Sequence, residues 1–163
     1  MSISKIKKDL EGQKKFPPVD QWNPDLCEGQ EFFIDREGNW FYNHSPIKNK
    51  KLINLFSTVI RNDDNNYFLV TPVEKVSVKV ELAPYKVIDF EISKNNIKLF
   101  TNMNYDFVLN ALNTTRLIAY NNSEIPLVHV RNNIEGFFDR NIYYKFVDLA
   151  LDNNCLLYTS PSP

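Results

Sequence analysis

Apolar and polar side chains follow two different periods along the chain. Between residues 73 and 80, valines alternate with Lys75, Ser77 and Lys79, which predicts a strand with one buried and one solvated face. Between residues 139 and 152, apolar residues recur every three or four positions, which predicts a helix. The same criteria predict helices over 2–13 and 49–60, β-hairpins over 31–43 and 87–101, and strands over 67–71, 107–112, 116–120 and 127–131.

Turn-forming residues separate these predicted elements. Gly38 marks a turn inside the first hairpin, and Asn49 is a suitable N-cap for the helix that follows. The polar run over 61–66 predicts a turn, and Pro72 predicts a bend or an edge position. Because strands and helices do not alternate regularly, a doubly wound parallel sheet is not favoured. The sequence predicts an α+β fold built mostly from antiparallel strands, and it shows no internal repeat.

The overall composition limits the class of protein. Of the 163 residues, 43% are hydrophobic, which is enough to fill a core. Lys and Arg number 19 against 20 Asp and Glu, so a dedicated nucleic-acid binder, which usually carries a basic excess, is not favoured. The N-terminus lacks the apolar run of a signal peptide, and no stretch reaches the length of a membrane span.

Cysteine and histidine are too few for most metal or disulfide chemistry. The two cysteines, Cys27 and Cys155, and the two histidines lack the spacing of a zinc site, so neither a metal nor a cofactor is expected. A single disulfide is the alternative to reduced thiols, and reduced thiols are favoured in a protein with so few cysteines. These observations predict a cytoplasmic protein that does not associate with membranes.

Seven sequence segments lie in a specific order between residues 17 and 152. They read PPVDQWNP (17–24), GNWFY (38–42), SPI (45–47), LFSTVIR (55–61), YFLVTPVEKV (67–76), VHVR (128–131) and NIYY (141–144). In this order they resemble a bacterial family known as domain of unknown function 1285. The resemblance implies two joined lobes, a mostly β lobe over 17–80 and an α/β-roll-like lobe over 81–154, after a helix or arm over 1–16. It implies no established activity.

The chain departs from the pattern of this family at two places. Asn132 and Asn133 stand where relatives tend to have glycines; asparagine tolerates a left-handed backbone, so the turn is expected to form. Residues 155–163 change composition abruptly and look like the translated adapter sequence of some metagenomic contigs, with a genuine flexible tail as the alternative. Relatives tend to continue with an aromatic, glycine-containing stretch, so native sequence is expected to end near Asn154.

Four residues near the C-terminal end form a candidate ligand-binding group. His129 and Arg131 are two apart on a predicted strand and are expected to point the same way, while Arg140 and Tyr144 are expected to share a helix face. Because guanidinium groups suit carboxylates and other anions, these side chains are candidates for a small anion pocket. The favoured interpretation is instead a polar strand face that forms an ion pair with one of two glutamates, Glu124 or Glu135.

Two further groups have both a binding and a structural interpretation. Thr71, Glu74 and Lys75 surround the bend at a proline, where they are candidates for holding a ligand between the lobes or for forming a structural corner. Trp40 and Tyr42 share one face of the first hairpin, where they are candidates for stacking a base, for clamping a peptide or for core packing. In both groups the structural interpretation is favoured.

Recognisable catalytic templates are missing from the sequence. It contains no phosphate-binding glycine loop, no HExxH and no GxSxG. Cys27 with His44 or His129 is a weak candidate for a nucleophile and base. The sequence favours a non-catalytic binding or regulatory module that recognises a small acidic ligand or a protein partner in a groove between the lobes.

Two alternatives to this functional expectation remain. One is a small enzyme that uses His129 and Arg131. The other is an RNA-binding module, which requires the lysine-bearing face of residues 75–79 to join Trp40 and Tyr42 on one surface.

Overall fold

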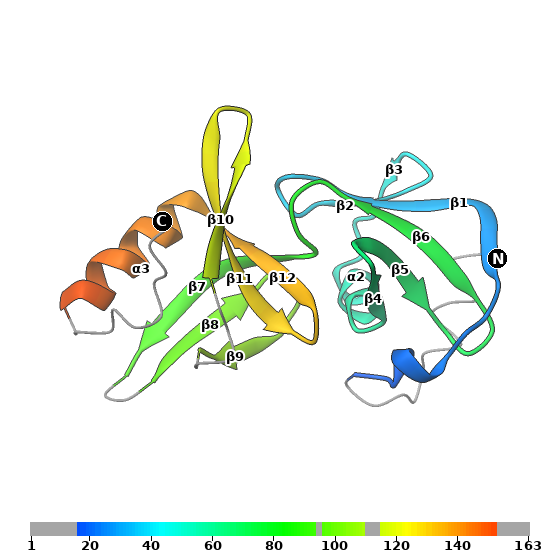
Figure 1. Cartoon of the computed structure of the whole chain (residues 1–163), viewed down its shortest axis with the longest axis horizontal. Coiled ribbons are helices and arrows are strands. Elements are labelled where there is room, and N and C mark those ends of the chain that lie inside the picture. Colours follow the sequence, from blue (N-terminus) through cyan, green and yellow to red (C-terminus); the bar gives the residue numbers. More distant parts are fainter. Residues whose placement is uncertain (1–15, 94–95, 110–114, 153–163) are drawn as a thin grey trace. The chain divides into compact units, whose positions relative to one another are not determined.

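The computed structural model divides the chain into two compact units, an N-terminal unit that ends at Pro84 and a C-terminal unit that begins at Tyr85. The helix expected over 2–13 and the tail over 155–163 lie outside the part of the chain that the structure describes. The described residues are 16–93, 96–109 and 115–152 (Figure 1).

The described part of the N-terminal unit, from residue 16 on, is a six-stranded sheet with one α-helix. Its elements are the 3-10 helix η1 (Val19–Gln21), β1 (Leu26–Ile34), β2 (Trp40–Tyr42), β3 (Ser45–Pro46), α2 (Lys50–Ser57), β4 (Ile60–Asp63), β5 (Asn66–Val70) and β6 (Lys75–Val80). The strands lie in the order β3-β2-β1-β6-β5-β4. Neighbouring strands pair antiparallel except β1 and β6, which pair in parallel at the centre of the sheet.

The core of the N-terminal unit lies between this sheet and α2. Phe56 of α2 packs its ring against Phe32 of β1, with 5.3 Å between the ring centroids, and against Trp40 of β2, at 6.4 Å. All three side chains are fully buried. Asn49 caps α2 as expected, because its side chain accepts a hydrogen bond from the backbone N–H of Leu52. The burial of these apolar rings provides most of the free energy that holds α2 on this face of the sheet.

One buried arginine holds the segment before β1 onto the sheet. Arg61 is only 8% exposed, and its guanidinium donates to the backbone carbonyls of Val19 at 2.7 Å and Trp22 at 2.6 Å. The same group forms a forked ion pair with the carboxylate of Asp63. These bonds use four of the five N–H donors of a charge that would otherwise be costly to bury.

The C-terminal unit is a second six-stranded sheet followed by a helix. Its elements are β7 (Tyr85–Ile92), β8 (Ile97–Thr101), β9 (Asp106–Val108), β10 (Thr115–Tyr120), β11 (Ser123–Arg131), β12 (Ile134–Phe138) and α3 (Arg140–Asp152). The strands lie in the order β10-β11-β12-β7-β8-β9. Again only the central pair, β12 and β7, is parallel.

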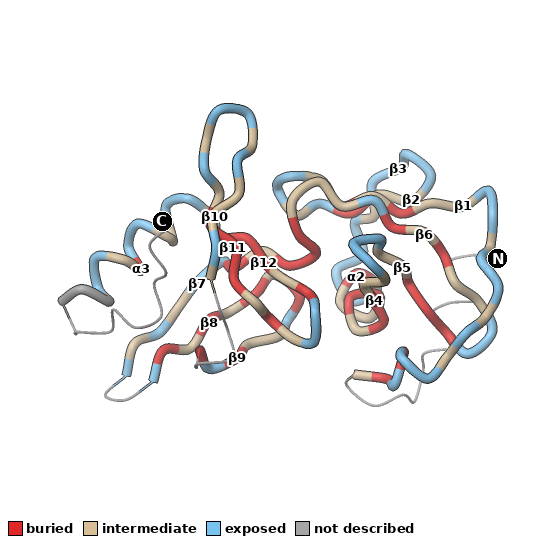
Figure 2. Tube along the Cα trace, viewed as in Figure 1, coloured by how far each residue is buried: buried red, intermediate tan, exposed pale blue. Residues whose placement is uncertain are grey.

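The helix α3 is attached to this sheet through a small aromatic cluster. Phe146 is fully buried, and its ring centroid lies 5.6 Å from those of Phe90 on β7 and Phe138 on β12. Figure 2 shows that most of the remaining surface of α3 is exposed or half-buried. Within the described part of the chain, neither α-helix is long and apolar enough to cross a lipid bilayer.

The expected α+β fold, with mostly antiparallel strands in two lobes, is confirmed. Two local expectations are wrong, and one strand was missed. The second helix ends at Ser57 instead of residue 60, the polar run over 61–66 contributes to β4 and β5 with only Asp64 and Asn65 at the turn, and β12 was not expected. Gly136 interrupts the apolar pattern of β12, which conceals the strand. Asn132 adopts a φ of 49°, so the expected left-handed turn before β12 is confirmed.

Candidate functional site

The register of β1 and β2 places two pairs of aromatic residues on opposite faces of the sheet. Phe32 lies opposite Tyr42 and Phe33 lies opposite Phe41, and side chains of directly paired residues share a face. The face that carries Phe32 is covered by α2. The other face carries Phe33 and Phe41, which remain only half-buried.

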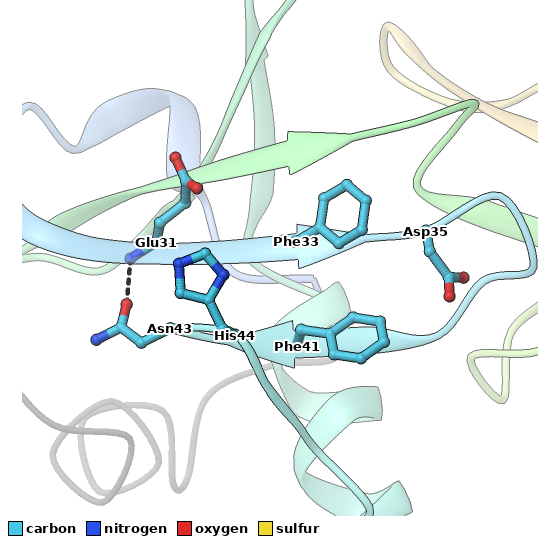
Figure 3. A pocket seen from close by; sticks show the side chains of 6 residues that line it. All are labelled: Glu31, Phe33, Asp35, Phe41, Asn43 and His44. Atoms are coloured by element: carbon cyan, nitrogen blue, oxygen red, sulfur yellow. Dashed lines mark hydrogen bonds between the residues drawn. The ribbon is translucent and has the colours of Figure 1, made fainter.

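A pocket of about 390 Å³ opens on this second face. Its lining consists of Glu31, Phe33, Asp35, Phe41, Asn43 and His44, and it is called the Phe33–Phe41 pocket below. The centroids of the two phenylalanine rings lie 5.9 Å apart, and the ring planes are inclined at 37°. Together the rings form the apolar floor of the pocket. Figure 3 shows Glu31 and His44 at one end of the pair of rings and Asp35 at the other. The volume is in the range that proteins use for small ligands or single side chains.

The rim of the Phe33–Phe41 pocket is acidic, but its two carboxylates have different surroundings. Asp35 accepts hydrogen bonds from the backbone N–H groups of Glu37 and Asn39, both at 2.9 Å, and thereby fixes the turn between β1 and β2. Glu31 faces the ammonium of Lys79, with 3.6 Å between the nearest atoms. That contact is exposed to solvent, so it is weak and a competing cation can displace it.

A left-handed turn completes the rim. Asn43 and His44 have φ angles of 45° and 73°, a conformation that asparagine and histidine tolerate better than bulkier residues. The Asn43 side-chain oxygen accepts a hydrogen bond from the backbone N–H of Glu31 at 2.9 Å, drawn as a dashed line in Figure 3. This bond ties the turn to β1 and keeps the imidazole of His44 beside the pocket.

The arrangement suits a ligand that combines positive charge with a flat or aliphatic surface. Aromatic faces attract cations and also pack against apolar stems. Glu31 and Asp35 add negative charge beside those faces, and Lys79 forms an ion pair with Glu31. Within the described residues, no three His, Cys, Asp or Glu side chains gather as the ligands of a metal would.

Trp40 and Tyr42 lie on the covered face. Trp40 is 1% exposed, which favours core packing over stacking on a ligand. The hydroxyl of Tyr42 donates to the side-chain oxygen of Gln30 at 2.7 Å, and burial, with a smaller contribution from Cys27, raises the pKa of Tyr42 above its ordinary value. The RNA-binding alternative required the lysine-bearing face to join these two residues. Instead, Lys79 lies opposite Phe33, on the other face of the sheet.

Thr71, Glu74 and Lys75 form a tight corner between β5 and β6. The Thr71 hydroxyl, in a fully buried side chain, accepts a hydrogen bond from the backbone N–H of Glu74 at 3.0 Å, and the backbone N–H of Thr71 donates to the carbonyl of Glu74 at 2.8 Å. The ammonium of Lys75 lies 4.7 Å from the ring centroid of Phe68. These contacts favour the structural interpretation of the corner.

His129 and Arg131 are separated by a β-bulge, which interrupts the strict alternation on which their common direction depended. A ring nitrogen of His129, Nε2, contacts the backbone carbonyl of Asn132. Arg131 donates from Nε to the hydroxyl of Tyr85 at 3.0 Å, and its guanidinium lies over the ring of the same tyrosine. In these contacts the two side chains have different partners.

Arg140 and Tyr144 lie at a different place in the C-terminal unit. Both line a cavity formed with Glu124, near the opposite end of β11 from Arg131. With a rise of about 3.3 Å per residue, seven residues of strand separate the two ends by roughly 20 Å. The predicted four-residue group is therefore distributed over two locations. Of the two glutamates considered as ion-pair partners, Glu135 forms a forked pair with Arg116 instead.

Comparison with known proteins identifies relatives that cover most of the chain. Residues 17–83 match the family described as domain of unknown function (DUF1285), N-terminal domain. A crystal structure of a DUF1285 family protein from Silicibacter pomeroyi is 30% identical, covers 88% of this chain and 82% of its own, and superimposes with a TM-score of 0.77. The chain belongs to the DUF1285 family.

A second solved structure, a DUF1285 family protein from Shewanella baltica, is 27% identical and has a TM-score of 0.60. The alignment covers 75% of this chain and 94% of that one. No curated protein is significantly similar to this chain. The family resemblance inferred from the sequence is therefore confirmed, and the family name assigns no activity to either relative.

Sequence reasoning missed the phenylalanine face of the hairpin. It identified the alternation that places Trp40 and Tyr42 together, but the same alternation also pairs Phe33 with Phe41. Two neighbouring aromatic residues on each face were the available signal. A strand with aromatic residues on both faces must expose one set unless a second layer covers it.

Proposed function

We propose that this DUF1285 protein is a non-catalytic binding module whose Phe33–Phe41 pocket takes a basic side chain, arginine or lysine, from a protein partner. The observation that supports this is the half-buried phenylalanine pair placed between two carboxylates. An arginine or lysine side chain matches both features, because its apolar stem packs on aromatic rings while its charge faces the acidic rim. The sequence also led us to expect a protein partner. The expected small ligand was acidic, whereas this pocket favours a basic group.

The Lys79–Glu31 contact supports the same preference from within the chain. A lysine already occupies the approach to Glu31 at 3.6 Å. The contact is exposed, since the Lys79 side chain retains 71% of its accessible surface. An incoming basic group can therefore replace Lys79 at little cost, and removing Lys79 should make the pocket more receptive.

Titration of the full chain with acetyl-arginine amide, followed by the NMR shifts of the amides of β1 and β2, tests this proposal. The neutral isostere acetyl-citrulline amide is the matched ligand control. We expect the arginine compound to bind more tightly, and added salt to weaken its binding, because the charged groups are near the surface. Equal binding of the two compounds would contradict a charge-selective pocket.

Three single substitutions sharpen the test. Glu31→Gln should weaken binding about threefold and Lys79→Gln should strengthen it by a similar factor, since exposed ion pairs contribute up to about 1 kcal/mol. Glu28→Gln, an exposed residue of the same strand that does not line the pocket, should leave the affinity unchanged. Weaker binding after Lys79→Gln would show that Lys79 belongs to the ligand site and would reverse the proposed charge preference.

For location, the small number of cysteines supports our proposal that the protein works in the reducing environment of the cytoplasm. Cys27 is a free thiol in the described part of the chain.

A further inference from the structure

A second cavity, in the C-terminal unit, has a different chemistry from the Phe33–Phe41 pocket. It holds about 230 Å³ between strands β10 and β11 and the first turns of α3. One acidic and one basic side chain, Glu124 of β11 and Arg140 of α3, line it, and it is called the Glu124–Arg140 cavity below.

The two charged residues of this cavity do not satisfy each other. The ion pairs found among the described residues do not include one between Glu124 and Arg140, and neither side chain forms a hydrogen bond within that part of the chain. In the same unit Arg116 and Glu135 do form a forked pair, at 2.7 and 2.8 Å. Opposite charges that line one cavity without meeting leave room for a ligand that carries both charges.

The remaining walls of the cavity are largely apolar or aromatic. Leu117 and Pro126 lie directly opposite each other on β10 and β11, and Phe138 is 3% exposed. Tyr143 packs its ring on Phe138 with 5.3 Å between centroids, while Tyr144 is 59% exposed at the mouth. Engineered apolar cavities of about 150 Å³ already hold benzene, so the volume admits one ring or a branched aliphatic group with its polar ends.

We infer that the Glu124–Arg140 cavity binds a free amino acid with an apolar side chain. The guanidinium of Arg140 receives the carboxylate, for which its planar fork of donors is suited. Glu124 lies within the same lining and faces the ammonium group, and the side chain of the ligand packs against the Leu117 and Pro126 wall. Both charged residues are exposed, so water solvates them when the cavity is empty. A ligand with a carboxylate alone would still bring its charge near Glu124, and an amine alone would gain nothing from Arg140.

This inference is independent of the proposed function, because the two pockets lie in different units and share no residue. It retains the acidic group that the sequence led us to expect on a ligand of Arg140 and Tyr144. It adds the second charge, which follows from the position of Glu124.

Calorimetric or NMR titration of the full chain with three matched compounds tests the inference. L-phenylalanine carries both charges, 3-phenylpropanoate only the carboxylate, and 2-phenylethylamine only the ammonium. We expect L-phenylalanine to bind with a dissociation constant on the order of 1 mM or tighter, and each single-charge analogue to bind about tenfold more weakly. Shifted amides should belong to β10, β11 and the start of α3.

Charge-removing variants connect this binding to the cavity. Arg140→Gln and Glu124→Gln should each weaken the binding of L-phenylalanine about tenfold. The Arg140→Gln variant should bind L-phenylalanine and 2-phenylethylamine with the same affinity. Lys145→Gln and Asp148→Asn remove exposed charges from the same helix outside the cavity, and they should leave the affinity unchanged. Unchanged melting of all four variants separates lost binding from lost folding.

Three results would overturn the inference. One is the failure of all three compounds to bind at millimolar concentration. Another is equal binding of 3-phenylpropanoate and L-phenylalanine, which would leave a simple anion site. The last is the same affinity in Arg140→Gln as in the unaltered chain. None of these outcomes bears on the binding of acetyl-arginine amide at the Phe33–Phe41 pocket.

Discussion

The two units of this protein share one strand order but differ in where the helix lies. In each unit three strands run from the centre of the sheet to one edge, and the next three run from the other edge back to the centre. The first and last strands therefore meet as a parallel pair, β1 with β6 and β12 with β7. Along the chain of the N-terminal unit, α2 comes after the first three strands and before the next three. In the C-terminal unit, α3 comes after all six strands.

This difference decides where each unit has an accessible pocket. Because α2 packs on Phe32 and Trp40, the opposite face of the hairpin keeps its phenylalanine pair partly open. In the C-terminal unit α3 starts directly after the central strand, and its first turns border the Glu124–Arg140 cavity instead. The same arrangement of strands thus carries these two pockets of different chemistry, because α2 and α3 cover different surfaces of their sheets. The C-terminal unit also has a pocket along β7, β8 and β9.

The units also differ in how they use an arginine–carboxylate pair. Arg61 in the N-terminal unit is buried and also serves two backbone carbonyls, whereas Arg116 in the C-terminal unit has 58% of its side chain exposed and bonds Glu135. A buried charge whose partners are all satisfied is costly to disturb, while an exposed pair is screened by water.

The largest effect is expected from Arg61→Met. The substitution leaves the carbonyls of Val19 and Trp22 without their donor and Asp63 without its ion pair, so the free energy of unfolding of the N-terminal unit should fall by about 3 kcal/mol. The fluorescence of Trp22 and Trp40 during denaturation measures this, because both tryptophans of the chain lie in that unit.

The matched variant for this comparison is Arg116→Met. It should lower the stability of the C-terminal unit by less than about 1 kcal/mol, since the pair is exposed. Equal losses for the two substitutions, each followed by hydrogen exchange within its own unit, would remove the distinction between a buried anchor and a surface pair.

An intermediate effect is expected from Gly136→Ala at the centre of the second sheet. A Cβ at Gly136 would lie 3.1 Å from the Cβ of Tyr85 and 3.2 Å from its backbone oxygen, so the parallel pair of β12 and β7 must separate slightly. We expect a loss of about 2 kcal/mol, seen as faster hydrogen exchange in β7, β11 and β12.

The control for this crowding is Gly29→Ala in the first unit. Gly29 has open space around it but a φ of +80°, so alanine should cost about 1 kcal/mol through backbone strain alone. If Gly136→Ala lowered the free energy of unfolding less than Gly29→Ala, close packing between β12 and β7 would not be what requires glycine at position 136.

The smallest effect concerns alkaline pH. Burial, and next the charge of Tyr144, raises the pKa of Tyr143 above its ordinary value of 10.0. The folded unit therefore holds this proton more tightly than the unfolded chain, so its stabilising contribution is complete below pH 10 and declines as the pH rises through the folded-state pKa. Ultraviolet titration of tyrosinate in the unaltered chain and in Tyr143→Phe measures the shift.

Tyr42→Phe makes the same comparison in the N-terminal unit, where burial also raises the pKa of Tyr42. In both variants the loss of stability above pH 10 should be shallower than in the unaltered chain. A loss that stays equally steep in Tyr143→Phe would mean that other groups dominate the alkaline transition.

Local sequence signals predicted the elements that are closed by near neighbours. The hairpin of β1 and β2, the cap of α2 at Asn49 and the left-handed turn at Asn132 all depend on residues within a few positions of one another. Local sequence patterns predicted the wrong structure where a tertiary contact determines the conformation. Ile60 continues the helical pattern of α2, yet it pairs with Leu69 as the first residue of β4.

The candidate sites were predicted less completely, for a related reason. Arg140 and Tyr144 line the same cavity, but His129 and Arg131, which the sequence grouped with them, do not line it, because sequence distance does not reveal a bulge or the direction of a strand. Glu124 was considered only as an ion-pair partner, and its place in the lining of a cavity depends on how α3 packs against β11.

By itself the sequence determined the α+β class, the family and the alternation that sorts the residues of each strand into two faces. It favoured core packing for Trp40 and Tyr42, but apolar character alone could not decide which face of the first hairpin is buried, because Phe32 and Trp40 on one side are as apolar as Phe33 and Phe41 on the other. Only the docking of α2, and the parallel pairing of strands distant along the chain, settled that choice. Such contacts leave no local pattern in the sequence, because they join residues that are far apart along the chain and that only folding brings together.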